Sequence, residues 1–82
     1  MTLTFAAARG YPLAQTESGT MYRAGLGVPV DLEEALFRYR IASRLGNAKA
    51  ERLLDELLPE VSPETASAAD ARVERWLRLN GS

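Results

Sequence analysis

The sequence contains neither cysteine nor histidine. Without cysteine the chain forms no disulfide and no thiolate metal site, and without histidine it lacks the commonest general base and metal ligand. It also has no apolar run near the roughly 18 residues that a membrane-spanning helix needs. The first nine residues lack the basic start and the longer apolar core of a secretory signal. We therefore expect a cytoplasmic protein with no metal site, no cofactor and no membrane insertion.

A strong charge of one sign is also missing. Ten basic residues stand against eleven acidic ones, for a net charge of -1, and the charges are scattered. A nucleic-acid binder is expected to carry a basic stripe, and none is present. Two groups of arginines lie on predicted helices, and solvated helix faces explain both better than a nucleic-acid surface: Arg38, Arg40 and Arg44, then Arg72, Arg75 and Arg78.

Nothing in the sequence assembles a catalytic centre. Serines such as Ser18 have no histidine to activate them. The adjacent carboxylates Glu33 and Glu34 are expected to point in different directions from a helix, so they should not converge on one substrate. We predict no catalytic residues, and a small hydrolase-type enzyme is only a remote alternative.

The sequence repeats itself in outline after 36 residues, since Gly10 maps to Gly46 and Ala14 maps to Ala50. An offset of this size fits two helices and two turns, and one such unit cannot bury its apolar faces without a neighbour. Helix caps and breakers, among them Asp31, Asn47 and Pro59, divide the chain into helices. We predict five, over about residues 2–9, 12–24, 32–45, 47–58 and 62–80.

One segment of the chain resembles a known family. Ala14, Gly19, Tyr22, Gly25 and Gly27 begin an ordered set that is similar to the Sel-one-like repeat, a relative of the tetratricopeptide repeat, and the set continues through Val28, Asp31, Ala35, Tyr39, Ala42, Gly46 and Ala50. The resemblance implies the C-terminal portion of an array with its closing helix. The fold class that it implies is all-α, a short α/α solenoid with a half repeat over 1–10, a full repeat over 11–46, a half repeat over 47–58 and a closing helix over 62–80, all in one domain.

The matching residues are expected to form the core. On the second helix these are Ala14, Ser18, Gly19 and Tyr22, and on the third they are Leu32, Ala35, Tyr39 and Ala42. In the closing helix, Ala66, Ala69, Val73, Trp76 and Leu77 form a stripe that can cover the open end of the stack. Ser18 and Arg38 depart from the family, which usually has leucine and tryptophan at these places.

A sharper departure is a second apolar stripe on the third helix, made of Phe37, Ile41 and Leu45. The family usually has polar residues at these positions, and a helix that is apolar on two sides needs a second neighbour. Three interpretations stay open. The closing helix lies across the stripe, or the stripe is a docking face for a partner or a second copy, or it is exposed without a role.

The start of the chain is the last departure. Counting back 36 residues places Leu3 at the Tyr39 position and Phe5 at the Ile41 position, so the chain begins inside a second-half helix. Solenoids normally have a polar cap at each end. Leu3, Phe5, Tyr11 and Leu13 are therefore expected to be partly uncovered, either because the chain is the tail of a longer array or because something stacks on this end.

Together these features predict a non-catalytic protein–protein interaction module. We expect a small accessory or scaffold subunit that docks into a larger assembly or pairs with a second copy of itself. A domain of this size buries a low fraction of its surface and is only marginally stable alone. The alternative is a free-standing adaptor or regulator that binds a peptide or helix in its concave surface. The predicted partner-binding residues are Phe37, Ile41, Leu45, Leu3, Phe5, Tyr11 and Leu13.

Overall fold

The computed structural model describes residues 11–80, which form four α-helices and a 3-10 turn with no strand among them. The helices are α2 (Tyr11–Ala24), α3 (Leu32–Arg44), α4 (Ala48–Leu57) and α5 (Pro63–Asn80), and the turn is η1 (Leu58–Glu60). The all-α class is thus confirmed. Four of the five predicted helices are present with ends close to those expected, and the predicted helix over 2–9 lies outside the described residues.

Side-chain caps begin three of the helices where the sequence predicts them. The Asp31 carboxylate accepts a hydrogen bond from the Glu34 backbone N–H at 3.0 Å, and the Asn47 side chain accepts one from the Ala50 N–H at 2.8 Å. Ser62 Oγ accepts from the Thr65 N–H at 3.1 Å before α5. These bonds satisfy N–H groups that the first turn of a helix leaves without a partner.

The Glu34 side chain does not return a hydrogen bond to the backbone N–H of Asp31. The Asp31 N–H donates to the Tyr22 carbonyl at 2.9 Å, so it needs no bond from the Glu34 side chain. The Glu34 carboxylate is therefore free to reach two arginines instead, as described below.

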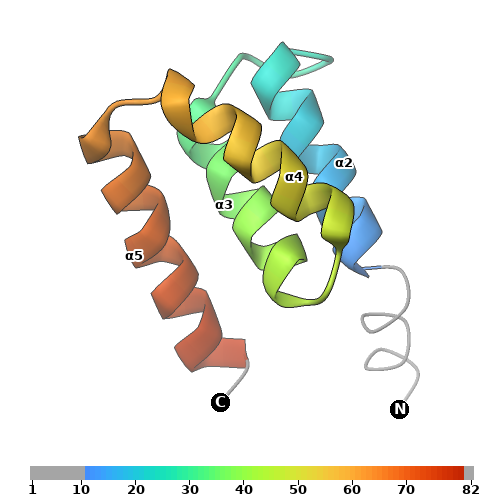
Figure 1. The fold of residues 1–82 in the computed structure, drawn as a ribbon, viewed down its shortest axis with the longest axis vertical. Coiled ribbons are helices and arrows are strands. Elements are labelled where there is room, and N and C mark those ends of the chain that lie inside the picture. Colours follow the sequence, from blue (N-terminus) through green and yellow to red (C-terminus); the bar gives the residue numbers. More distant parts are fainter. Residues whose placement is uncertain (1–10, 81–82) are drawn as a thin grey trace.

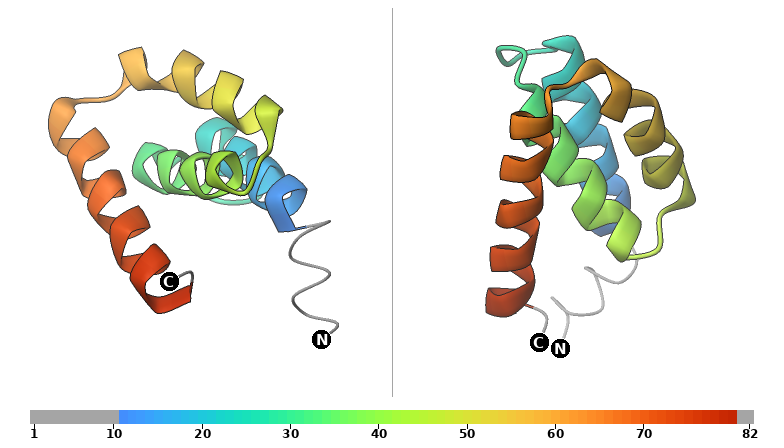
Figure 2. Two further views of the ribbon diagram at one scale, coloured as in Figure 1. Left: turned by 60° about the horizontal axis from the view of Figure 1, so that its bottom comes forward. Right: turned by 60° about the vertical axis from the view of Figure 1, so that its left-hand side comes forward.

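Helix α3 is central, and α2, α4 and α5 all pack mainly against it. Figures 1 and 2 show α2 beside α3, α4 crossing over α3, and α5 descending along the other flank of α3. The core cluster joins Leu36 and Tyr39 of α3 to Leu54 and Leu57 of α4 and to Ala69 of α5. The stripe predicted on α3 is confirmed for Ala35, Tyr39 and Ala42, each with no exposed surface, and Leu32 packs at its edge.

Close packing between α2 and α3 depends on Gly19. A Cβ built at this glycine would lie 2.6 Å from Cε1 and 2.7 Å from Cδ1 of Tyr39, well inside van der Waals contact. The Tyr39 ring thus fills the space of an absent side chain, and its hydroxyl lies 2.9 Å from Oγ1 of Thr20. The predicted core position Ala14 is wrong, because this residue lies on the far side of α2 and is exposed.

Candidate functional site

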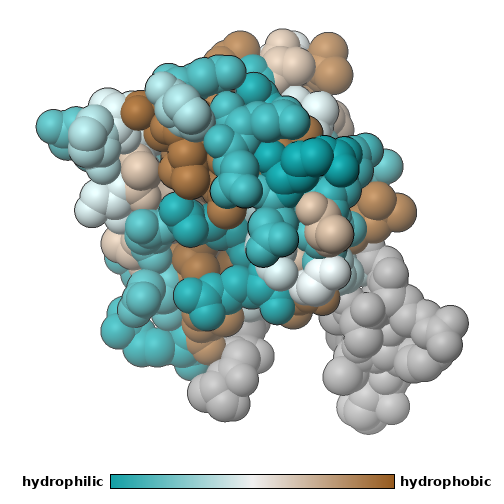
Figure 3. Space-filling view, viewed as in Figure 1, coloured by the Kyte–Doolittle hydropathy of each residue, from teal (hydrophilic) through white to brown (hydrophobic). Residues whose placement is uncertain are grey.

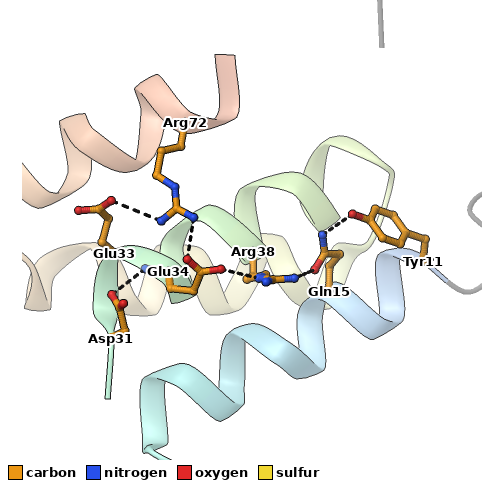
Figure 4. A network of polar contacts seen from close by, with 7 residues as sticks. All are labelled: Tyr11, Gln15, Asp31, Glu33, Glu34, Arg38 and Arg72. Atoms are coloured by element: carbon orange, nitrogen blue, oxygen red, sulfur yellow. Dashed lines mark hydrogen bonds and ion pairs between the residues drawn. The ribbon is translucent and has the colours of Figure 1, made fainter. Parts of the chain in front are cut away.

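A polar network joins α5 to α3 (Figure 4). Arg72 of α5 donates from Nη2 to Oε1 of Glu34 at 2.7 Å and from Nη1 to Oε2 of Glu33 at 3.4 Å. The other oxygen of Glu34, Oε2, accepts from Nε of Arg38 at 2.8 Å. The expectation that Glu33 and Glu34 do not converge is therefore wrong, because a guanidinium that arrives from α5 spans both carboxylates.

The network continues from α3 into α2. Arg38 donates from Nη1 to Oε1 of Gln15 at 2.7 Å, and Gln15 donates from Nε2 to the Tyr11 hydroxyl at 2.6 Å. Gln15 is only 4% exposed, and both of its polar atoms are satisfied by these bonds. Arg38, which stands where the resembled family often has tryptophan, thus links two helices through its head group. Arg38 and Arg72, which were expected on solvated helix faces, have side chains that are 30% and 33% exposed, and their head groups are engaged in ion pairs.

Aromatic rings also contribute to the contacts between α2, α3 and α5. The Arg72 guanidinium carbon lies 4.4 Å from the centroid of the Phe37 ring, which is a cation–π distance. The ring of Tyr11 on α2 stacks against the ring of Trp76 on α5, with centroids 6.4 Å apart and planes inclined by 10°. Helices α2 and α5 are therefore joined to each other as well as to α3. We call this set of polar and aromatic contacts the clamp.

Pairing changes the acidity of the groups at the centre of the clamp. Burial by itself would raise the pKa of Glu34, but hydrogen bonds from Arg72 and Arg38 outweigh it and hold that pKa below its usual value. Burial would lower the pKa of Arg72, and the hydrogen bond and charge of Glu34 reverse this and raise it. Glu34 is consequently an ionised acceptor near neutral pH rather than a proton donor.

Replacing Glu34 by glutamine should make the protein less stable at neutral pH and less sensitive to acid. A carboxyl whose pKa is lowered by folding contributes stability above its unfolded pKa and loses it as the pH falls through the folded pKa. We expect Glu34→Gln to lower the free energy of unfolding by about 1 kcal/mol near neutral pH, because a charge-assisted bond becomes a neutral one. Urea unfolding at neutral and acidic pH measures both effects.

Glu33→Gln is the matched control for this prediction, since the Glu33 contact to Arg72 is longer. It should change stability less than Glu34→Gln and leave most of the acid sensitivity in place. An equal effect of the two substitutions would contradict the central place of Glu34 in the clamp.

The three members of the second stripe on α3 have different surroundings. Ile41 has no exposed surface, Phe37 is half-buried with Arg72 over its ring, and Leu45 at the end of the helix is 41% exposed. The first of the three interpretations, in which the closing helix covers the stripe, fits Phe37. Leu45 is therefore the most exposed of the three, and Ile41 offers no surface to a partner in this arrangement.

The residues predicted to be partly uncovered at the N-terminal end also differ in their exposure. Leu3 and Phe5 lie outside the described residues. Tyr11 is half-buried through its contacts with Gln15 and Trp76, whereas Leu13 is 50% exposed. Three further exposed apolar side chains that sequence reasoning missed lie on α2 and its following loop: Met21 at 42%, Leu26 at 57% and Val30 at 60%. We call these three and Leu13 the α2 apolar surface.

A cavity of about 330 Å³ lies where α3, α4 and α5 meet. Arg40 and Arg44 of α3 face Asp70 and Glu74 of α5 across it, with Leu54 and Val73 between them. Arg40 pairs with Asp70 at 2.6 Å, while Arg44 and Glu74 form no ion pair with any residue in the range 11–80. Figure 3 shows hydrophilic surface over α4 and apolar surface along the seam between α4 and α5.

Comparisons with family models, with curated proteins and with solved structures return no match to this chain. No helix in the described part of the chain is long and apolar enough to cross a membrane. No group of three or more carboxylate side chains placed to hold a metal ion occurs within residues 11–80.

Proposed function

We propose that this chain is a non-catalytic protein–protein interaction module, a small accessory or scaffold subunit that docks into a larger assembly. The observation that carries the proposal is the α2 apolar surface. Four large apolar side chains, each at least 42% exposed, come from one helix and the loop after it. A domain that buries so little surface gains stability when such side chains are covered by a partner.

The repeat architecture supports the same function. In this proposal α2 and α3 are the full Sel-one-like repeat, α4 begins the next one, and α5 closes the short solenoid. The 36-residue offset places α4 where α2 stands in its own repeat. Helical repeats of this kind build extended surfaces that bind other proteins.

The polar groups favour binding over catalysis. Both oxygens of the Glu34 carboxylate accept hydrogen bonds, one from Arg72 and one from Arg38. The Gln15 side-chain amide also has both of its polar atoms hydrogen-bonded. A general acid or base needs a group that can exchange a proton near the working pH. In the clamp the ion pairs oppose such an exchange.

The isolated chain is expected to associate with itself as its concentration rises, because the α2 apolar surface then lacks its partner. Light scattering of the purified full chain measures this. Leu13→Asp combined with Leu26→Asp should return it to a monomer, whereas Leu79→Asp, at an exposed apolar position on α5, should not. A monodisperse, stable monomer of the unaltered chain at every concentration would count against the accessory-subunit proposal.

A chain that stays monomeric at every concentration would favour the second candidate function, a free-standing adaptor that binds a peptide or helix in its concave surface. The cavity between α3, α4 and α5 is the observation in its favour. Its opposite walls carry a base, Arg44, and an acid, Glu74, neither of which forms an ion pair within residues 11–80, and the middle of the cavity is apolar. A groove formed by so few helices is short, so the affinity from this surface alone would be modest.

A further inference from the structure

Helix α5 is the longest of the described helices, but it contributes little to the core. Among its described side chains only Ala69 and Val73 are buried, and its largest one, Trp76, is only partly covered. The shorter helix α4 buries two leucines, Leu54 and Leu57. Because the hydrophobic gain follows the apolar area removed from water, the two fully buried side chains of α5 add less stability than those of α4.

The contact between α5 and the other helices is also incompletely packed. The cavity of about 330 Å³ lies along it, with Leu54 on one side and Val73 on the other. At the edge of this cavity the Nε atom of Arg40 is shielded from solvent and lies 2.6 Å from Oδ1 of Asp70, yet it makes no hydrogen bond. A shielded donor without a hydrogen bond and an unfilled space both cost free energy.

Charged groups fix the position of α5 instead. The Arg72 guanidinium lies between Glu33 and Glu34 and over the ring of Phe37. The side chains of Arg72 and Glu34 are 33% and 14% exposed, and ion pairs that water still reaches add little net stability. The place of α5 on α3 is thus specified by charge, while the apolar attraction that holds it there is small.

We propose that α5 occupies a helix-binding site on α3 and leaves it when a helix of a partner protein takes its place. The proposal rests on the interaction function proposed above and names the site and its partner. Ala69 belongs to the same core cluster as Leu36 and Leu54, so removal of α5 would uncover part of that cluster. Val61 and Ser62 separate η1 from α5, so α5 can move away while α4 stays in place. Elements with few buried apolar contacts are the ones that open locally.

The seated α5 shows which partner helix fits this site. It places small side chains, Ala66 and Ala69, against the core cluster, and it brings one arginine to two adjacent carboxylates. Once α5 leaves, Glu33 and Glu34 lose this base, and the partner has to supply another. Arginine suits the place better than lysine, because its planar head group can reach both carboxylates at once.

A fluorescein-labelled peptide with the sequence of residues 62–80 is a suitable probe, because it reproduces the helix that fits the site. The receptor is the full chain that carries Arg72→Glu. This substitution sets a third acid beside Glu33 and Glu34, so it should release the chain's own α5 and leave the site on α3 unchanged. By fluorescence anisotropy, the peptide is expected to bind this variant at least about tenfold more tightly than it binds the unaltered chain.

Nuclear magnetic resonance locates the bound peptide. In the ¹⁵N-labelled Arg72→Glu chain, the peptide should return the amide resonance of Phe37 to its position in the unaltered chain, while the chain's own Ala69 resonates as in an exposed segment. Arg75→Glu is the matched control, because it makes the same charge change at an exposed residue of α5 that forms no ion pair within residues 11–80. Its affinity for the peptide should equal that of the unaltered chain.

Absence of peptide binding to the Arg72→Glu chain, or equal affinities of the Arg72→Glu and Arg75→Glu chains, would overturn the proposal. So would a dimer of the unaltered chain that Arg72→Glu abolishes and that the Leu13→Asp, Leu26→Asp pair does not affect. That dimer would assign the site to α5 of a second copy. Each of these results leaves self-association through the α2 apolar surface as the separate test of the proposed function.

Hydrogen exchange of the unaltered chain tests the release of α5 without any substitution, and it decides the matter if the Arg72→Glu chain does not fold. The amides of Ala69 and Val73 are expected to exchange at least about tenfold faster than those of Leu36 and Leu54, because α5 opens before the rest of the domain. Equal protection of the four amides would show that α5 opens only when the whole domain unfolds, and the proposal would then be wrong.

Discussion

Replacing Tyr39 by alanine should lower the free energy of unfolding by about 3 to 5 kcal/mol, which is a large part of the total stability of a small domain. Tyr39 is the largest of the side chains with no exposed surface; its ring packs on Gly19 of α2, and it belongs to the same core cluster as Leu54 and Leu57 of α4. Alanine would leave a cavity at the meeting point of three helices. We expect the variant to be mostly unfolded at physiological temperature, as circular dichroism and thermal unfolding would show.

Tyr39→Phe is the control for this result. It keeps the ring and removes only the hydroxyl that lies 2.9 Å from Oγ1 of Thr20, so its cost should be about 1 kcal/mol. If Tyr39→Ala unfolded at the same temperature as the unaltered protein, the assignment of Tyr39 to the centre of the core would be wrong.

Placing valine at Gly19 should lower the free energy of unfolding by about 2 to 3 kcal/mol through overpacking. The first added carbon would meet Cε1 and Cδ1 of Tyr39 at 2.6 and 2.7 Å and the Ala35 carbonyl oxygen at 3.3 Å. The ring cannot turn aside easily, because it is fully buried and its hydroxyl is bonded to Thr20. The helices α2 and α3 would have to separate.

The destabilisation expected from Gly19→Val is opposite to the effect of helix propensity, so it would report on packing rather than on the intrinsic stability of the helix. A residue with a side chain normally stabilises a helix interior relative to glycine, by roughly 0.5 to 1 kcal/mol for alanine. Ser18→Val, one residue earlier on the same helix, is the matched control and should change stability little. Urea unfolding of the two variants compares them. A gain in stability from Gly19→Val would show that α2 and α3 are not in close contact at this point.

Short-range signals in the sequence were sufficient to locate the helices. Asp31 and Asn47 cap helices where predicted, since a side chain can bond to an N–H three residues away in any fold. The 3.6-residue spacing of Ala35, Tyr39 and Ala42 likewise identified the core face of α3. These features depend on neighbours along the chain, which the sequence displays directly.

The candidate sites were harder to predict, because they depend on which helices meet. Ile41 was predicted to bind a partner, but it is fully buried, while Met21 and Val30 were not singled out and are exposed. The 36-residue offset contained a usable signal for Met21. It pairs this residue with Leu57, which is fully buried against the core cluster, whereas Met21 is 42% exposed.

The sequence by itself determined that this protein is helical, where the described helices begin and end, and which stripe of α3 faces the core. Only the tertiary structure decided that α5 packs against α3, because that choice depends on whether the charged α4 side chains Glu51, Arg52 and Asp55 are desolvated or stay in water. The same packing brought Arg72 between Glu33 and Glu34 and linked Arg38 to Gln15. Side chains 23 to 39 positions apart meet there, and no local pattern encodes such a meeting.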